Sequence, residues 1–294
     1  MATDVKELMA KVGKIRILTN RLVDDQLSGD YHSTFKGQGV EFDEVRPYVA
    51  GDDVRSIDWN VTARLQKPYI KIFEEEREQT VMLLVDVSQS NVFASHNQFK
   101  RDIITEIAAT LAFSAIQNND KIGIIFFSDK IEKLIPPQKG KKHILYIIRE
   151  LLEFKPESNG TDIGQALQYL TNAIKKRCTA FLISDFVSPV NYEEPAIIAN
   201  KKHDLVGIHV YDERDKELPD VGLMKLRDAE TGESMWVDTS SQKVRMMYKD
   251  YKVERYLNLQ KVIARSGMDC VDIETQQDYV KALLSLFRRR GAKK

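Results

Sequence analysis

Short apolar runs alternate with helical patterns along most of the chain. Apolar runs with the length of buried strands occur at 81–87, 121–128 and 179–186, and further strand-like segments follow at 204–212 and 268–274. Strands separated by helices predict crossover connections and a mostly parallel sheet. Because such crossovers are right-handed, the helices cover both faces of the sheet. We therefore expect an α/β fold built on a doubly wound, Rossmann-like sheet.

Helical patterns fill the intervals between these strands. Apolar residues recur at every third or fourth position at 99–115, 144–152, 163–174, 241–266 and 279–287. Two shorter patterns differ from this alternation. The run KIEKLIPP (130–137) is typical of an edge strand ended by its two prolines. The sequence ETGE lies between two strand-like runs and predicts a protruding β-hairpin insertion at about 223–239.

The first 78 residues form a separate region in this interpretation, and 79–290 form the α/β domain. Val5, Leu8 and Val12 belong to an amphipathic helix within 1–30. We expect this helix to dock on the rest of the chain; contact with a membrane surface is the alternative. It lacks the continuous apolar core of a signal peptide, and residues 31–78 are polar and irregular.

Composition limits the class of protein. The 294 residues are 43% hydrophobic, enough for a sizeable core. Lysine plus arginine and aspartate plus glutamate each number 44, so no net charge favours a nucleic-acid partner. No stretch reaches the roughly 18 apolar residues of a transmembrane helix. The two cysteines, Cys178 and Cys270, indicate reduced thiols in a cytoplasmic protein.

Polar side chains break the first apolar strand at its end. In VMLLVDVSQSNVF (81–93), Asp86, Ser88 and Ser90 stand at alternate positions, Asp185 ends a later strand, and Thr161 precedes a helix. The carboxyl ends of neighbouring parallel strands meet at one sheet edge, where ligands bind. Five oxygen donors without Cys or His favour a hard cation such as Mg²⁺. Capping of the following helices is the alternative role for the same residues.

The order and spacing of these five residues resemble the metal-ion-dependent adhesion site of von Willebrand factor A domains. The resemblance covers about 79–290. It implies that Ser88, Ser90 and Thr161 bind Mg²⁺ (or Mn²⁺ or Ca²⁺) directly, and that Asp86 and Asp185 act through bound water. One metal position would then remain for an Asp or Glu of a protein partner.

The segment at 35–78, called here the signature segment, resembles a bacterial family known as domain of unknown function fifty-eight. The residues that carry this likeness are Gly37, Gly39, Glu41, Phe42, Arg46, Tyr48, Gly51, Asp52, Arg55, Ile57, Asp58, Trp59, Ala63 and Arg64. The resemblance implies association with MoxR-type AAA+ ATPases. Many members carry transmembrane helices before this segment, so the chain looks like a shorter, soluble form. We expect its charged residues to form a structural ion-pair network, with a partner surface as the alternative, and Trp59 to be buried.

Three functions are compatible with these patterns. We expect a non-enzymatic, Mg²⁺-dependent protein-binding module that acts with an AAA+ ATPase on other protein complexes. A Mg²⁺-dependent phosphohydrolase with Asp86 as nucleophile is the enzymatic alternative. It lacks a phosphate-binding loop, and no basic residue immediately flanks the cluster. A structural scaffold with a relic metal site is the third.

Overall fold

The computed structural model describes residues 39–76, 79–88, 94–95, 98–212, 217–227 and 234–291. The helix expected within 1–30, the candidate ligand Ser90 and the signature residue Gly37 lie outside the described residues. The chain divides into two compact units, one within Phe35–Gln79 and the other containing Thr80–Lys294.

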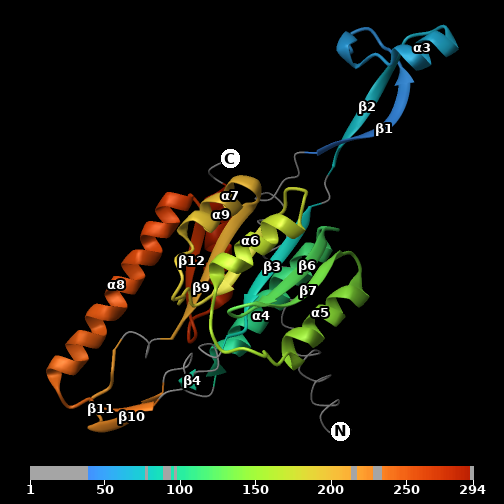
Figure 1. The fold of residues 1–294 in the computed structure, drawn as a ribbon. Helices are drawn as coiled ribbons and strands as arrows, with labels where there is room; N and C mark the ends of the chain where they lie inside the picture. Colours follow the sequence, from blue (N-terminus) through green and yellow to red (C-terminus); the bar gives the residue numbers. More distant parts are fainter. Residues whose placement is uncertain are drawn as a thin grey trace, which may run out of the picture. The chain divides into compact units, whose positions relative to one another are not determined.

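A six-stranded sheet forms the centre of the larger unit, in the order β12-β9-β8-β3-β6-β7 (Figure 1). Five strands are parallel, and β7 pairs with β6 in the antiparallel direction. The strands are β3 (Thr80–Asp86), β6 (Lys121–Phe127), β7 (Ile131–Gln138), β8 (Thr179–Ser184), β9 (Asp204–Tyr211) and β12 (Asp269–Glu274). The expected α/β fold with a mostly parallel, doubly wound sheet is thus confirmed.

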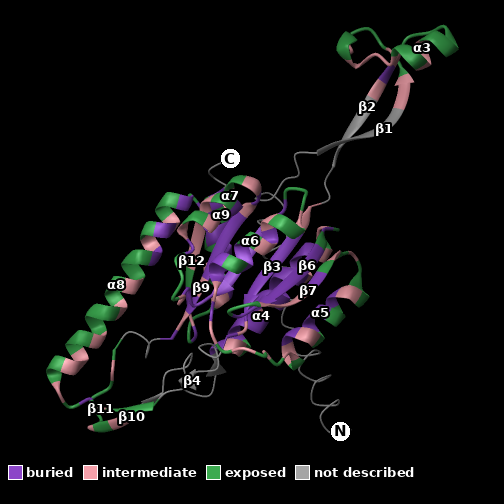
Figure 2. Cartoon of the chain, in the orientation of Figure 1, coloured by how far each residue is buried: buried purple, intermediate pink, exposed green. Residues whose placement is uncertain are grey.

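Helices cover both faces of this sheet. They are α4 (Lys100–Gln117), α5 (Lys141–Glu153), α6 (Ile163–Ala173), α7 (Glu193–Lys202), α8 (Gln242–Ser266) and α9 (Tyr279–Gly291). Met82 and Leu84 of β3 share one core with α6, α7 and the last turns of α8. Since side chains alternate along a strand, Val85 points to the opposite face, where it meets Ile104 of α4. Figure 2 shows the central strands almost entirely buried between the two layers.

One strand differs in detail from the sequence prediction, and the predicted hairpin is confirmed. Strand β7 continues through Pro136 and Pro137, because an edge strand leaves one row of backbone groups unpaired and tolerates missing donors. The predicted hairpin is present as β10 (Leu223–Arg227) and β11 (Ser234–Asp238), which form a separate two-stranded sheet. A further two-stranded sheet consists of the short strands β4 (Ala94–Ser95) and β5 (Gln98–Phe99).

The smaller unit is more regular than the polar sequence of 31–78 indicates. Its elements are β1 (Gly39–Pro47), a 3₁₀ turn η2 (Val54–Ser56), α3 (Trp59–Leu65) and β2 (Tyr69–Glu76), with β1 and β2 antiparallel. The expectation that Trp59 is buried was wrong, since the side chain is 69% exposed. It occupies the first turn of a short helix, and no buried residue lies on that helix.

Side-chain hydrogen bonds hold the connection between β1 and β2. Arg46 donates two hydrogen bonds to Asp52, at 2.8 and 2.7 Å, and Asp52 also accepts one from the backbone N–H of Val49. Asp53 caps η2, and Asp58 caps α3. The charged residues thus form a partly exposed ion pair and two local caps within this unit, rather than the expected buried ion-pair network that holds the segment on the sheet. None of the helices in the described part of the chain combines the length and apolar character needed to span a bilayer.

Candidate metal centre

The candidate site lies where the order of strands in the sheet reverses. Strands β3 and β8 are neighbours, and the chain proceeds from β3 to β6 on one side and from β8 to β9 on the other. Loops leaving such a pair diverge and open a crevice beyond the carboxyl ends of the strands. Asp86 is the last residue of β3, and Asp185 directly follows β8.

Asp86 is a buried carboxylate, only 2% exposed. Its Oδ2 accepts a hydrogen bond from the Ser184 hydroxyl at 2.6 Å, and its Oδ1 accepts one from the Ser88 backbone N–H at 3.0 Å. Burial, and after it the charge of Asp185, together raise the pKa of Asp86 to about 6, against the lowering effect of hydrogen bonds from Ser184 and Ser88. The site thus holds an acid pair that a nearby cation would stabilise.

A tight turn after β8 fixes Asp185. Its Oδ1 accepts a hydrogen bond from the Val187 N–H at 3.0 Å, and the Phe186 N–H donates to the Ser184 hydroxyl at 2.9 Å. Phe186 has a φ of 55°, in the left-handed region that bulky residues seldom occupy. Since Phe186 is buried, packing holds this strained backbone in place and fixes the direction of the Asp185 side chain.

Thr161 lies on a loop held between the ends of β6 and β8. The Asp162 N–H donates to the carbonyl of Ser128, just after β6, and the Ser188 hydroxyl donates to the carbonyl of Thr161. The Thr161 hydroxyl is buried and has no hydrogen-bond partner among the described residues. Capping does not explain this residue, because Asp162 is the N-cap of α6 and accepts from the Gln165 N–H at 2.9 Å.

Four of the five predicted ligands can therefore be placed, and all four lie at the carboxyl edge of β3, β6 and β8. Ser88 is fully buried next to Asp86. The donor set consists of hydroxyl and carboxylate oxygens, and the described residues contain no group of three or more His, Cys, Asp or Glu side chains suited to a metal. Hard oxygen donors with a buried, partnerless hydroxyl fit Mg²⁺.

The structure adds two basic residues that sequence reasoning missed. Lys100 and Arg101 begin α4, and Lys100 Nζ lies 3.7 Å from Asp185 Oδ2. No basic residue is adjacent to the cluster in the sequence, as expected. The fold nevertheless brings Lys100 next to Asp185. One signal was available: two cations in the first turn oppose the helix dipole, so their placement there requires another reason.

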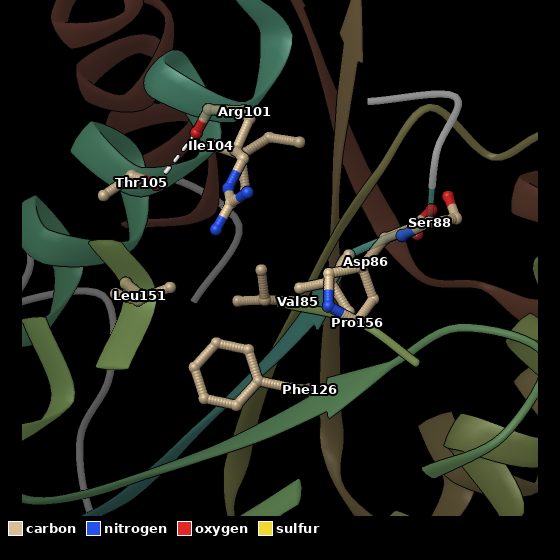
Figure 3. Close-up of a pocket in the computed structure, with 10 residues that line it drawn as sticks. Val85, Asp86, Ser88, Arg101, Ile104, Thr105, Phe126, Leu151 and Pro156 are labelled. Atoms are coloured by element: carbon tan, nitrogen blue, oxygen red, sulfur yellow. Dashed lines mark hydrogen bonds between the residues drawn. The ribbon is translucent and has the colours of Figure 1, made fainter. Parts of the chain in front are cut away.

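A small cavity adjoins Asp86 on the side of α4 and α5. Figure 3 shows Arg101 of α4 and Phe126 of β6 on opposite sides of the space, with Asp86, Ser88 and Pro156 at one end. The Arg101 guanidinium donates to the carbonyl of Phe154. The volume of about 30 Å³ holds one or two water molecules. As lined by the described residues, this cavity is smaller than a nucleotide or a sugar phosphate.

Comparison with known families finds one match across most of the chain. The model of a family described as "Protein of unknown function DUF58" matches residues 44–256. The uncharacterized protein Rv1480 of Mycobacterium tuberculosis strain H37Rv is 29% identical over 295 residues, covering 98% of this chain and 92% of that protein. The uncharacterized protein MAV169 of Mycobacterium avium is 30% identical over 162 residues, covering 54% of this chain and 95% of that protein.

Solved structures share the fold at low sequence identity. The conserved hypothetical protein BatB of Bacteroides thetaiotaomicron has a TM-score of 0.51 and 17% identity, covering 74% of this chain and all of that one. An aerotolerance-related membrane protein of Bacteroides fragilis has the same TM-score and coverage at 14% identity. The VWA domain of SpRpn10 is similar at a TM-score of 0.39 and 10% identity, with 72% of this chain covered.

Proposed function

The chain belongs to the DUF58 family, and from that membership and the geometry of the site we propose that it is a Mg²⁺-dependent protein-binding module without catalytic activity. Its partner contributes the carboxylate of an Asp or Glu to the bound ion. The partner class that the family resemblance implies is a MoxR-type AAA+ ATPase, with which the protein would assemble or activate other complexes.

The buried hydroxyl of Thr161 carries this proposal. A polar group taken out of water without a hydrogen bond costs about 1–3 kcal/mol, so native proteins rarely retain one without a use. Thr161 is 1% exposed and its hydroxyl has no partner in the described part of the chain. A metal ion bound by this oxygen removes the cost. Capping of α6, the main structural alternative, falls to Asp162.

The remaining residues divide into two groups. Ser88, Thr161 and, by the resemblance, Ser90 would hold the ion through neutral oxygens. Asp86 and Asp185 would orient these hydroxyls and the ion's water through their carboxylates. Because the direct ligands are neutral, the ion keeps its positive charge and attracts one further anionic oxygen. That is the chemistry Mg²⁺ supplies in this proposal, and it makes recognition specific for an acidic residue of the partner.

The surroundings of Asp86 disfavour the phosphohydrolase. A nucleophile must be exposed to substrate, whereas Asp86 is buried and both of its carboxylate oxygens accept hydrogen bonds. The adjacent cavity holds only one or two waters, and Arg101 is engaged with a backbone carbonyl. These features favour a binding role.

Affinity between purified proteins tests the proposal. The chain is immobilised, and the MoxR-type ATPase of the same organism is passed over it in Mg²⁺ or in EDTA. We expect binding in Mg²⁺ and loss of binding in EDTA. The variants Asp86→Ala and Thr161→Ala should lose binding while keeping the circular dichroism spectrum of the wild type.

Two outcomes contradict the proposal. Binding that survives both EDTA and the two substitutions shows that the metal takes no part. Hydrolysis of ATP or a generic phosphate ester by the pure chain, abolished by Asp86→Asn, shows an enzyme instead. The Thr110→Val variant is the control. It changes a buried residue in the middle of α4 that is not a candidate metal ligand, and it should keep Mg²⁺-dependent binding.

A further inference from the structure

Lys100 is a buried cation in an unfavourable position. It is 3% exposed and begins α4, where the positive end of the helix dipole repels an ammonium group. Removing a charged group from water is costly unless an opposite charge compensates. One anion that Lys100 meets is Asp185, whose Oδ2 lies 3.7 Å from Lys100 Nζ, and both side chains are almost fully buried.

The contact between Lys100 and Asp185 is ionic. A charge-assisted hydrogen bond between these groups would measure about 2.7–2.9 Å, clearly shorter than the separation in the structure. The Lys100 ammonium therefore neutralises Asp185 without a short hydrogen bond to its carboxylate. Asp185 also keeps its Oδ1 contact with the Val187 N–H, which fixes the carboxylate independently of Lys100.

The Lys100 ammonium and a bound divalent ion would thus interact with the same pair of carboxylates, Asp86 and Asp185. Asp86 and Asp185 repel one another, and either a lysine or a divalent ion relieves that repulsion. A positive charge held at Asp185 also opposes the arrival of a second one, because like charges a few ångströms apart repel strongly away from bulk water.

We propose that Lys100 is a built-in counter-charge that neutralises the acid pair when no ion is bound and thereby lowers the affinity of the site for Mg²⁺. This inference rests on the proposed metal-binding function and adds a positioning residue to it. Lys100 keeps the protein folded without the ion and makes ion binding weak enough to be reversible. Metal binding and partner binding can then be coupled, since a partner carboxylate adds the negative charge that shifts the balance toward the ion.

Replacement of Lys100 by methionine tests the inference. Methionine keeps much of the side-chain length and removes the charge. In EDTA, Lys100→Met should melt at a lower temperature than the wild type, because the acid pair loses its compensation. In calorimetric titration its Mg²⁺ dissociation constant should fall about tenfold, as expected when a nearby like charge is removed. Mg²⁺ should therefore raise its melting temperature more than that of the wild type.

Three control variants separate charge from packing. Lys100→Arg keeps the charge and should retain wild-type metal affinity. Lys141→Met removes one positive charge at the start of α5, an exposed position near the amino end of β6, and should change neither property. The double variant Lys100→Met with Asp185→Asn removes both charges, so it should be more stable in EDTA than Lys100→Met alone.

Each outcome decides a different point. An unchanged or weaker Mg²⁺ affinity in Lys100→Met, with binding by the wild type, overturns the role of Lys100 but leaves the metal site intact. Absence of Mg²⁺ binding in both proteins overturns the inference together with the proposed function. Binding by Lys100→Met alone supports the inference and contradicts metal dependence of the wild type. If both Lys100→Met and the double variant fail to fold, Lys100 acts through packing and the inference is wrong.

Discussion

At the end of β3 and around it, hydrogen bonds fix the positions of the individual site residues. Asp86 and Asp185 are fixed by hydrogen bonds from Ser184, Ser88 and Val187. Thr161 is fixed through backbone hydrogen bonds of its loop, and its buried hydroxyl has no hydrogen-bond partner among the described residues. Two buried polar groups, the Thr161 hydroxyl and the His203 ring, are expected to affect stability in different ways.

Thr161→Val should stabilise the protein in the absence of metal. The variant removes a buried hydroxyl that has no partner among the described residues, and we expect a gain of about 1 kcal/mol in the free energy of unfolding. Urea denaturation in EDTA measures it. Thr110→Val is the matched control, because the buried Thr110 hydroxyl donates to the Glu106 carbonyl at 2.8 Å, and its loss should destabilise. Equal destabilisation by both substitutions would show that Thr161 has a protein partner.

His203 should make the protein sensitive to acid. Burial, together with the smaller effects of the Lys202 and Arg177 charges, lowers the pKa of His203 from 6.5 to about 4. Between these pH values the unfolded chain binds a proton that the folded chain does not. Stability contributed by neutral His203 is therefore complete above pH 6.5 and is lost as the pH falls toward 4.

The His203→Gln variant isolates this effect. Urea denaturation of both proteins from pH 7 to pH 4.5 should show the wild type losing stability relative to the variant, with a limiting slope of about 1.4 kcal/mol per pH unit for one proton. The neutral ring accepts a hydrogen bond from the Cys178 N–H, so the variant starts from a lower stability at pH 7. Parallel pH profiles would contradict the assignment.

At the scale of elements, the order of the strands determines where the site lies, and side-chain contacts from α9 stabilise two of the strands. Asp86 and Asp185 meet because β3 and β8 are neighbours, although 98 positions separate Asp86 from its hydrogen-bond partner Ser184. The amino ends of the strands are secured differently. Arg290 of α9 donates to both carboxylate oxygens of Asp204 on β9, at 2.5 and 2.6 Å, and lies 3.0 Å from Asp269 on β12.

Arg290→Met should destabilise the sheet edge opposite the site. Arg290 is buried, and its replacement removes the guanidinium that pairs with two partly buried carboxylates, which we expect to cost about 2–3 kcal/mol. Arg288→Met, at an exposed position of the same helix, is the control and should change stability by less than about 0.5 kcal/mol. Chemical denaturation measures both. A cost for Arg290→Met no larger than that of the control would contradict a stabilising role for the contacts of Arg290 with Asp204 and Asp269.

The sequence predicted most elements because periodicity and burial agree in them. The central strands β3 and β6 show as apolar runs, and both begin and end within a residue or two of their predicted limits. The hairpin of β1 and β2 was harder to foresee, because a turn and a helix separate its strands and each has polar neighbours. Hydrophobicity also gave the wrong result for Trp59, which is exposed on a short helix.

The site was predictable only as far as it depends on strand ends. Asp86, Ser88 and Asp185 follow or end buried strands, and Thr161 precedes a helix, so topology alone brings them to one edge. Lys100 reaches the site from the first position of α4, and no spacing rule links a helix start to a strand end. Its role depends on burial and on a distance to Asp185, which sequence patterns do not contain.

At the scale of the whole molecule, the balanced charge means that attraction of a charged partner has to come from local sites. The 44 basic and 44 acidic residues leave no net charge to steer a partner over long distances. The proposed metal site would present one divalent ion at the carboxyl edge of the sheet and so attract an anionic group at a single point. The smaller unit adds exposed apolar residues of its own, among them Val49, Val54 and Trp59. Metal-dependent recognition is therefore the central claim about the protein.

Calorimetric titration of the full chain with Mg²⁺ tests that claim most directly. The wild type should bind one ion per chain and gain thermal stability, and Mn²⁺ should give the same result. The Thr161→Val variant should bind at least about tenfold more weakly, because a direct ligand is missing. Absence of both heat and thermal shift in the wild type, or equal affinity in the variant, would contradict a metal centre built from Asp86, Ser88, Ser90, Thr161 and Asp185.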